Sequence, residues 1–497
     1  MLRTIIAHEL RLLAKSPAAI FMFILLAASM AFGAWNGQRA VERQNTSAAV
    51  AIAEEAAIKQ RVLDELVAYE KYQAERGLPT EFAPVSHSKP RPGQAPQGTN
   101  AGAVGGELLK EVAVLPPTGL SAFAVGQMDL QRNYTLVDMK NKFNMSDNFE
   151  IENPLILMNG TFDISFVILF ILPVFIIALT YDMLSGEKEA GTLALAMTQP
   201  VSLRTFMAGK LISRGIVLFG VILVMGLGAL VYTAGSLDML GLSATWTRFG
   251  LWLLAVVLYA AFWFGLGVLV NAFNKSSETN ATALAASWLL FVVVMPALVN
   301  LTATTVYPAP SRMELKVAMR EAFTEAEKAE DVATKAFNID HAEMVSDAES
   351  QLYLTSFLAR QVAMEDAVEP VFNNFRTQLA RQEKLVGWFQ YLSPAIVMQL
   401  ALNEVSGSST ARYNAYMDKV FEFHQEWRDY FTPKYLQRVV LHSSMYDQFP
   451  KFSYPEEPVS VVWNRTAASF IGLFIIVGVL TFYAFGRLRR FGVRENS

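Results

Sequence analysis

The chain has 497 residues, of which 53% are hydrophobic and 17% are charged, and its formal net charge is −4 at pH 7. This composition excludes most soluble enzymes and is typical of a membrane protein. Because the sequence contains no cysteine, disulfide bonds, thiolate metal sites and cysteine nucleophiles are excluded as well.

The first 16 residues predict an amphipathic helix at the membrane surface. Its apolar side chains recur at helical spacing, whereas charged residues occupy other positions. The apolar face consists of Leu2, Ile5, Ile6, Leu10 and Leu13. Pro17 separates this helix from the first candidate span, residues 17–35. The alternative is that residues 1–16 extend that span.

A long segment without a span follows, residues 36–163. Apolar residues at helical spacing predict a helix over 39–76, which would extend roughly 55 Å at 1.5 Å per residue. Residues 77–106 are rich in Pro, Gly and small polar residues, and they predict a mobile linker or an irregular loop. Residues 107–163 allow strands or irregular structure, and Asp163 is placed to cap the next span.

The second candidate span, residues 164–181, leads into a polar segment, residues 182–214. This polar segment contains a Gly-Lys pair at 209–210, as nucleotide-binding P-loops do. However, a leucine follows the pair instead of Ser or Thr, and Arg204 stands where the first glycine of a P-loop is needed. The chain is therefore not expected to bind ATP through this motif.

Within the polar segment, the residues indicate two short helices separated by a break. Thr192 is placed to cap a first helix over 193–199, which Pro200 would end. Ser202 is placed to cap a second helix, which starts at Leu203 and continues toward the third span. Such a pair would lie at the membrane surface, and an ordinary amphipathic interfacial loop is the alternative.

The rest of the chain contains four further candidate spans. Residues 215–302 hold spans three to five, and residues 466–486 form the sixth. None of the six spans contains the ionisable residues that ion-coupled carriers generally keep there. Residues 303–465 predict a second large, mainly helical segment, and residues 487–497 form a basic tail.

Basic residues near the span ends indicate the orientation of the chain. The side that carries both termini and the polar segment holds twelve of the 41 Lys and Arg residues but only six of the 45 Asp and Glu residues. We therefore expect both termini in the cytoplasm of a bacterium, with the chain in the inner membrane. Segments 36–163 and 303–465 would then be extracytoplasmic.

The stretch "EKEAGTLALAMTQPVSLRTFMAGKL" (187–211) resembles the cytoplasmic segment of ATP-binding-cassette (ABC) exporter permeases of the type-2 family. The shared pattern is an acidic pair, Gly-Thr, an apolar run, Pro-Val-Ser and Gly-Lys. The stretch "NPLILMNGTFDISFVILFILPVFIIALTYDMLSGE" is similar to the subgroup with large extracytoplasmic insertions. The resemblance implies an all-α polytopic membrane protein with six transmembrane helices, an N-terminal elbow helix (1–16) and a large, mainly helical extracytoplasmic region.

The resemblance also implies that the polar segment docks onto a separate ATPase subunit as a coupling helix. ATP and Mg²⁺ would bind to that ATPase, and this chain would hold no catalytic residue, cofactor or metal. Leu203, Phe206 and Met207 would insert into a groove of the ATPase, with Arg204 and Lys210 near acidic residues or lipid phosphates. The expected contact residues are Glu187, Glu189, Gly191, Thr192, Pro200, Ser202, Leu203, Arg204, Phe206, Met207, Gly209 and Lys210.

We therefore expect a permease subunit of an exporter-type complex, paired with a second, identical or paralogous, permease subunit. The uncharged spans suit an amphiphilic, lipid-linked or hydrophobic cargo better than a small ion. One alternative is a subunit that transmits ATP-driven motion to a periplasmic partner without transport. Another is a membrane-anchored sensor or scaffold without an ATPase. No nucleic acid is expected as a partner.

Overall fold

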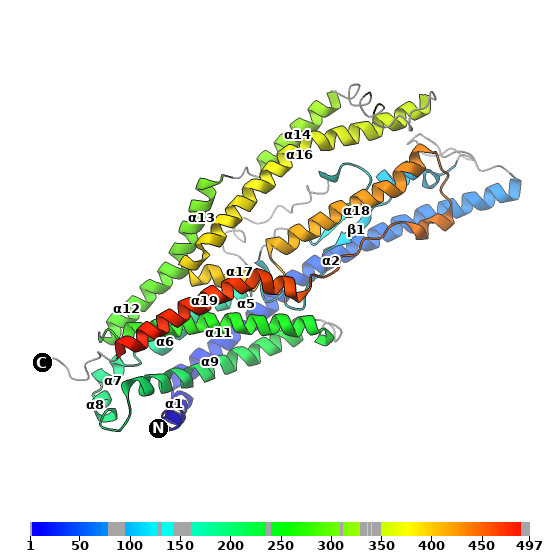
Figure 1. Ribbon diagram of the computed structural model, residues 1–497. Helices are drawn as coiled ribbons and strands as arrows, with labels where there is room; N and C mark the ends of the chain where they lie inside the picture. The colour runs from blue at the N-terminus through cyan, green and yellow to red at the C-terminus, as the bar shows by residue number, and fades with distance from the viewer. Residues whose placement is uncertain are drawn as a thin grey trace.

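The computed structural model describes residues 2–77, 95–126, 132–143, 161–234, 240–308, 312–328 and 349–488, with residues 335 and 339 between them. Six of its helices are long and apolar enough to cross a membrane, and strands are few. The expected all-α polytopic membrane fold is therefore confirmed. Helices α1, α7 and α8 lie at one end of the bundle, here called the terminal side (Figure 1). The opposite end, the domain side, carries the large non-spanning region.

The first two helices meet at Ser16. Helix α1 spans Leu2–Lys15, and helix α2 spans Pro17–Arg76. The Ser16 hydroxyl accepts a hydrogen bond from the backbone N–H of Ala19 and caps the start of α2. The predicted first span and the helix predicted over 39–76 therefore form one continuous helix of 60 residues, as Figure 1 shows in blue.

The other spans surround helix α11. The second span runs through α5 (Ile164–Phe166), η5 (Val167–Ile171) and α6 (Leu172–Thr180). The remaining spans are α9 (Leu203–Thr233), α11 (Ser243–Asn271), α12–η6–α13 (Ser277–Trp288, Leu289–Val294 and Met295–Val306) and α19 (Val459–Arg487). Trp252, Tyr259 and Trp263 of α11 are fully buried at the centre of this bundle.

Two spans contain a local π-helical turn that ends two residues before a proline. The turn η5 precedes Pro173, and the turn η6 precedes Pro296. A proline removes one backbone donor and crowds the preceding turn, and a π-turn is one way for the backbone to adapt. The start of the second span is capped as predicted, because the Asp163 carboxylate accepts from the N–H of Phe166 at 2.8 Å.

Two glycines of helix α2 allow it to contact the backbone of two other segments of the chain. A Cβ on Gly33 would lie 2.8 Å from the backbone of Asp163, and a Cβ on Gly37 would lie 2.1 Å from the carbonyl oxygen of Ala122. Only glycine allows a backbone to approach a helix this closely. The pair therefore fixes the point at which α2 passes the start of the second span.

On the domain side, the outer half of α2 packs against a small mixed body. Its elements are η1 (Gln97–Thr99), α3 (Ala101–Ala103), η2 (Val104–Leu108), β1 (Glu111–Val114), β2 (Tyr134–Val137), α18 (Thr410–Leu436) and η9 (Ser443–Gln448). Strands β1 and β2 pair antiparallel, with Glu111 opposite Val137. Tyr416, Trp427 and Phe431 of α18 are buried in the core of this body.

The prediction of a mobile linker or an irregular loop over 77–106 is wrong for residues 97–106. Residues 97–106 form helical turns and are largely buried. A Cβ on Gly102 would lie 2.3 Å from the ring of Tyr435, and one on Gly105 would lie 2.7 Å from the ring of Phe431. The glycines therefore allow close packing against α18. Residues 78–94 lie outside the described residues.

Helices α14 (Arg312–Lys328) and α16 (Glu349–Phe389) run side by side as a helical arm (Figure 1). The charged helix predicted over 311–337 is confirmed as far as Lys328. The short turn η8 (Gln390–Leu392) then leads into α17 (Pro394–Ser406). With 13 residues, α17 is too short to span a membrane, yet its apolar side chains join the core of the spans. Segment 303–465 is therefore not wholly separate from the membrane bundle.

Candidate functional site

The polar segment forms two short helices at the terminal side. Helix α7 spans Ser185–Glu189, and helix α8 spans Thr192–Ala196. Gly191 lies between them in the left-handed conformation, with φ of 72°, and takes the position that caps α8. The prediction that Thr192 is the cap is therefore wrong. The Thr192 hydroxyl instead donates to the carboxylate and the backbone carbonyl of Glu187.

The second half of the polar segment follows the prediction more closely. The Ser202 hydroxyl accepts from the N–H of Thr205 at 3.2 Å and caps α9, which begins at Leu203. Helix α8 ends at Ala196, before the predicted end at residue 199. Pro200 therefore lies in an exposed turn between the helices and does not end α8 directly.

Lys210 is the charged centre of this region. Its side chain is only 4% exposed, and its Nζ lies 2.6 Å from Oε1 of Glu187 and 3.3 Å from Oε1 of Glu9. A buried ammonium needs such partners, because an unpaired charge in the interior is costly. A Cβ on the adjacent Gly209 would lie 2.6 Å from Cγ2 of Ile5. The Gly-Lys pair therefore fixes α1 to the polar segment and to α9.

Two further contacts hold the polar segment to neighbouring spans. The Glu189 carboxylate accepts from the N–H and the hydroxyl of Ser277 at 2.7 and 2.8 Å, at the positive first turn of α12. Asn271, at the end of α11, donates to the carbonyl of Thr180 at 2.8 Å and accepts from the N–H of Leu184 at 3.1 Å. The polar segment is thus attached to α1, α11 and α12 together.

The exposed apolar surface of the polar segment differs from the predicted one. Met207 is fully buried in a cluster at the terminal side, and Leu203 and Phe206 are half-buried against the same cluster. The prediction that Met207 offers a contact to a partner is therefore wrong. Leu195 is 71% exposed, whereas Leu193 on the opposite face of α8 is buried. Helical spacing places Leu193 and Leu195 on opposite faces, but the sequence does not say which of the two is exposed.

The remaining predicted residues lie around this surface. Glu189, Gly191, Thr192, Pro200 and Ser202 are exposed, and Glu187 and Arg204 are half-buried. Gly209 and Lys210 are buried beneath them. The structure thus brings the predicted residues together in one region, with the Gly-Lys pair inside it and α8 on its surface.

A second charged group, here called the domain-side cluster, was missed by sequence reasoning. It consists of Arg248, Glu404, Arg412, Glu456, Glu457 and Arg465. Glu456 accepts from the buried Arg248 of α11 at 2.9 Å and from the buried Arg412 of α18 at 2.6 Å. Arg248 also donates to the carbonyl of Val405 at 3.1 Å, at the end of α17.

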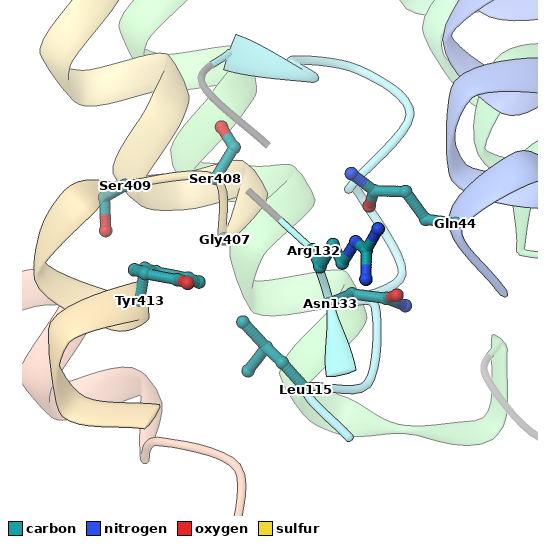
Figure 2. A pocket seen from close by; sticks show the side chains of 8 residues that line it. All are labelled: Gln44, Leu115, Arg132, Asn133, Gly407, Ser408, Ser409 and Tyr413. Carbon is teal, nitrogen blue, oxygen red and sulfur yellow. The ribbon is translucent and has the colours of Figure 1, made fainter. Parts of the chain in front are cut away.

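The cluster continues to the last span. Arg465 of α19 donates to Glu404 of α17 at 3.0 Å and to both carboxylate oxygens of Glu457 at 2.9 Å. Beside it, the turn between α17 and α18 faces Arg132 and Asn133 across a small cavity of about 10 Å³, which Gln44 of α2 also lines (Figure 2). The domain-side cluster therefore connects α11, α17, α18 and α19 where the spans meet the domain.

Neither charged region has the composition of a metal centre. In the part of the chain that the structure describes, no group of three or more His, Asp or Glu side chains could hold a metal ion. Both regions consist of ion pairs and hydrogen bonds, which fix helices relative to one another.

Comparison with known proteins gives the following matches. A family model described as "ABC-2 family transporter protein" matches residues 3–488. A protein of Stutzerimonas stutzeri described as "Probable ABC transporter permease protein NosY" is 30% identical over 127 residues. That match covers 25% of this chain and 45% of the relative, so the chain matches less than half of the relative's length.

Proposed function

Since the chain belongs to the ABC-2 family of transporter proteins, and is thus an ABC transporter permease, we propose that it couples ATP hydrolysis by a separate ATPase subunit to export across the inner membrane. ATP and Mg²⁺ would bind to that ATPase and not to this chain. The NosY relative is described as a permease, which supports the proposal. Both termini and the polar segment would face the cytoplasm, in keeping with the excess of basic residues on that side.

One observation carries the proposal: the polar segment is firmly attached to the bundle and yet exposes an apolar surface on α8. Its contacts to α1, α11 and α12 let a force on α8 reach three helices at once. Leu195, 71% exposed, lies where it could enter a groove of the ATPase. Movement of packed helices as rigid bodies would then carry the motion through the membrane.

The proposed assembly contains a second permease subunit, identical or paralogous. Large apolar side chains remain exposed along several spans, including Phe474 and Phe482 of α19, which are 66% and 84% exposed. Lipid or a second subunit would cover such surfaces, and six spans per subunit give twelve for a pair.

The docking surface can be tested by co-purification. Leu195→Glu should abolish stoichiometric recovery of the ATPase with the full chain, because it places a charge in an apolar contact. The matched control is Met313→Glu, which changes a 69% exposed apolar residue of α14 on the domain side. Equal ATPase recovery with Leu195→Glu and the wild type would show that α8 is not the docking surface.

A second candidate function is transmission of ATP-driven motion to an extracytoplasmic partner without transport. The domain-side cluster favours it, because buried ion pairs join the spans to a domain that comprises much of the chain. Reconstituted vesicles distinguish the two functions. Net movement of cargo supports export, whereas an ATP-dependent change in the domain without transport supports transmission. A sensor or scaffold without an ATPase would recover no ATPase in the co-purification.

A further inference from the structure

A large cavity lies between the helical arm and the rest of the domain. It has a volume of about 1160 Å³ and is lined by α16 and α18, by α17, and by the domain-side ends of α13 and α19. Small-molecule sites usually occupy roughly 300–1,000 Å³. The polar segment does not reach the cavity, and only Glu404 and Arg465 of the domain-side cluster line its edge. The cavity is therefore distinct from the polar segment and touches the domain-side cluster only at these two residues.

The cavity has a group of aromatic and aliphatic side chains at the end far from the spans. Its far end is lined by Phe372, Phe375, Leu379, Met417 and Phe421. The rings of Phe372 and Phe421 meet edge to face with centroids 6.2 Å apart, and Arg376 pairs with Asp418 at 3.0 Å beside them. Toward the spans, the lining includes the polar residues Asn300, Gln390, Thr466 and Ser469 beside apolar ones such as Leu400. Gln390 lies about 27 Å along the chain from Phe372 at 1.5 Å per helical residue.

The charges that line the cavity are balanced except at one residue. Arg376 pairs with Asp418, and Glu404 pairs with Arg465. Glu383 of α16 also lines the cavity, and within the described residues no cation lies at ion-pair distance from it. The surrounding protein raises the pKa of the Glu383 carboxyl through desolvation. A cation that enters the cavity would therefore find an uncompensated carboxylate, which attracts it.

Two residues next in sequence to lining residues are apolar and exposed. Leu301 of α13 is 62% exposed, and Trp388 at the end of α16 is 75% exposed. Exposed aromatic residues of this kind are typical of the boundary between membrane and water. A molecule dissolved in the outer part of the bilayer would reach the cavity without crossing bulk water.

We propose that this cavity binds a cationic amphiphile, a molecule with an apolar chain and a positively charged head. The chain would occupy the aromatic far end, and the head would lie near Glu383. The assignment of this molecule as cargo rests on the proposed function, whereas its binding does not.

Binding can be measured by calorimetry on the purified full chain in phosphatidylcholine nanodiscs, with dodecyltrimethylammonium as the probe and empty nanodiscs as the background. We expect saturable binding that Glu383→Gln weakens by about fivefold, as for loss of one partly exposed ion pair. The matched control is Glu426→Gln, an exposed glutamate of α18 outside the cavity, which should bind like the wild type. Ala380→Trp and Leu379→Trp should each weaken saturable binding, because the indole occupies part of the space beside the aromatic end.

The pH dependence of probe binding is a second measurement, because a purely structural role of Glu383 would not produce it. The probe is permanently charged, so its binding should strengthen as pH rises through the pKa of Glu383 and should lose this dependence in Glu383→Gln. The other ionisable side chains that face the cavity are Arg376, Glu404, Tyr413 and Arg465. Unchanged thermal unfolding of the variants would show that they are folded.

Two outcomes would overturn the proposal. One is identical binding of the probe by the wild type, Glu383→Gln and the two tryptophan variants. That result would show that the probe only partitions into the lipid. The other is that the wild type binds the neutral probe dodecyl maltoside as tightly as the cationic probe. That result would show that the positive charge does not contribute to binding. Because the measurement needs neither ATPase nor transport, its failure leaves the proposed function intact, and a failure of export leaves the cavity site intact.

Discussion

At the scale of single residues, Lys210 shows how a buried charge can organise a contact between distant parts of the chain. Its ammonium joins Glu9, on the first helix, to Glu187, in the polar segment. The sequence alone suggested an ATPase contact for Glu187 and no role for Glu9, and it did not indicate that either carboxylate pairs with Lys210. Together with Lys210 they form an ion triad in which Lys210 and Glu9 are buried and Glu187 is half-buried.

Removal of Lys210 should therefore destabilise the protein strongly. Lys210→Met leaves Glu9 buried without its cation, and loss of one member of a buried pair typically costs about 3–5 kcal/mol. The double variant Lys210→Met/Glu9→Gln should recover part of this loss, because it also removes the stranded charge. Chemical unfolding of the single and double variants measures the difference. Additive effects would show that the two side chains do not interact.

His424 predicts a pH dependence of stability. It is 2% exposed, its Nε2 donates to the carbonyl of Lys140 at 2.6 Å, and burial, reinforced by the charge of Arg428, lowers its pKa to about 4. In the unfolded chain the imidazole titrates near 6.5. Between these two values the unfolded state binds more protons than the folded state, so stability falls as pH falls from about 6.5 toward 4.

The expected loss is up to about 3 kcal/mol over this range. His424→Gln keeps a donor for the Lys140 carbonyl but does not titrate. Its thermal unfolding temperature should therefore fall less between pH 7 and pH 4.5 than that of the wild type. A parallel fall in both proteins would assign the pH dependence to other groups.

Residue-level predictions succeeded where the interaction is local. Asp163 and Ser202 cap their helices as predicted, because the donor lies three residues away. The prediction that Thr192 caps α8 was wrong because Gly191 adopts the left-handed conformation and takes the capping position. The prediction that Met207 contacts a partner was wrong because apolar periodicity identifies a face of a helix but does not say whether the chain itself or a partner covers that face.

At the scale of elements, α17 connects the membrane bundle to the domain. Its N-terminus is capped by Ser393, its apolar side chains pack among the spans, and its last carbonyls accept from Arg248. The domain-side cluster surrounds its end. The cluster thus acts at the junction of four helices, and a change in it should affect all of them.

Glu456→Gln tests this junction. It leaves the buried guanidinium groups of Arg248 and Arg412 without a carboxylate, although backbone carbonyls still accept from both. Because the Glu456 side chain is 38% exposed, we expect a loss of about 2–3 kcal/mol, below the usual cost for a fully buried pair. The control Glu422→Gln removes an exposed pair with Lys419 and should cost less than about 1 kcal/mol. Equal unfolding midpoints of the two variants would contradict the role of Glu456.

The six spans and the charged helix from Arg312 could be predicted because hydropathy and charge patterning are properties of neighbouring residues. The buried turns over 97–108 could not, because their glycines pack against Phe431 and Tyr435, more than 300 positions later. The domain-side cluster escaped prediction for the same reason. Its ion pairs join residues that only the folded chain brings together.

At the scale of the whole molecule, α2 physically connects the terminal side to the domain. If the proposed coupling to an ATPase is correct, Thr46→Pro should interrupt it. Thr46 is exposed between the spans and the body, and proline inside a helix costs about 3 kcal/mol and kinks it. ATP-dependent distance changes between spin labels on the domain should shrink in this variant, while ATPase recovery is retained. Thr46→Ala is the control, and an unchanged signal in Thr46→Pro would assign transmission to other helices.

The close contact at Gly33 and Gly37 gives α2 a mechanical property. The contact lies near the middle of the molecule but not near the middle of the helix, since roughly 24 Å of α2 extends on the terminal side and roughly 58 Å on the other. A stiff rod held at such a point is a lever with unequal arms. If α2 pivoted at this point together with the body packed on its long arm, the distal tip would move in the opposite direction to the short arm, to which α1 is joined, and more than twice as far.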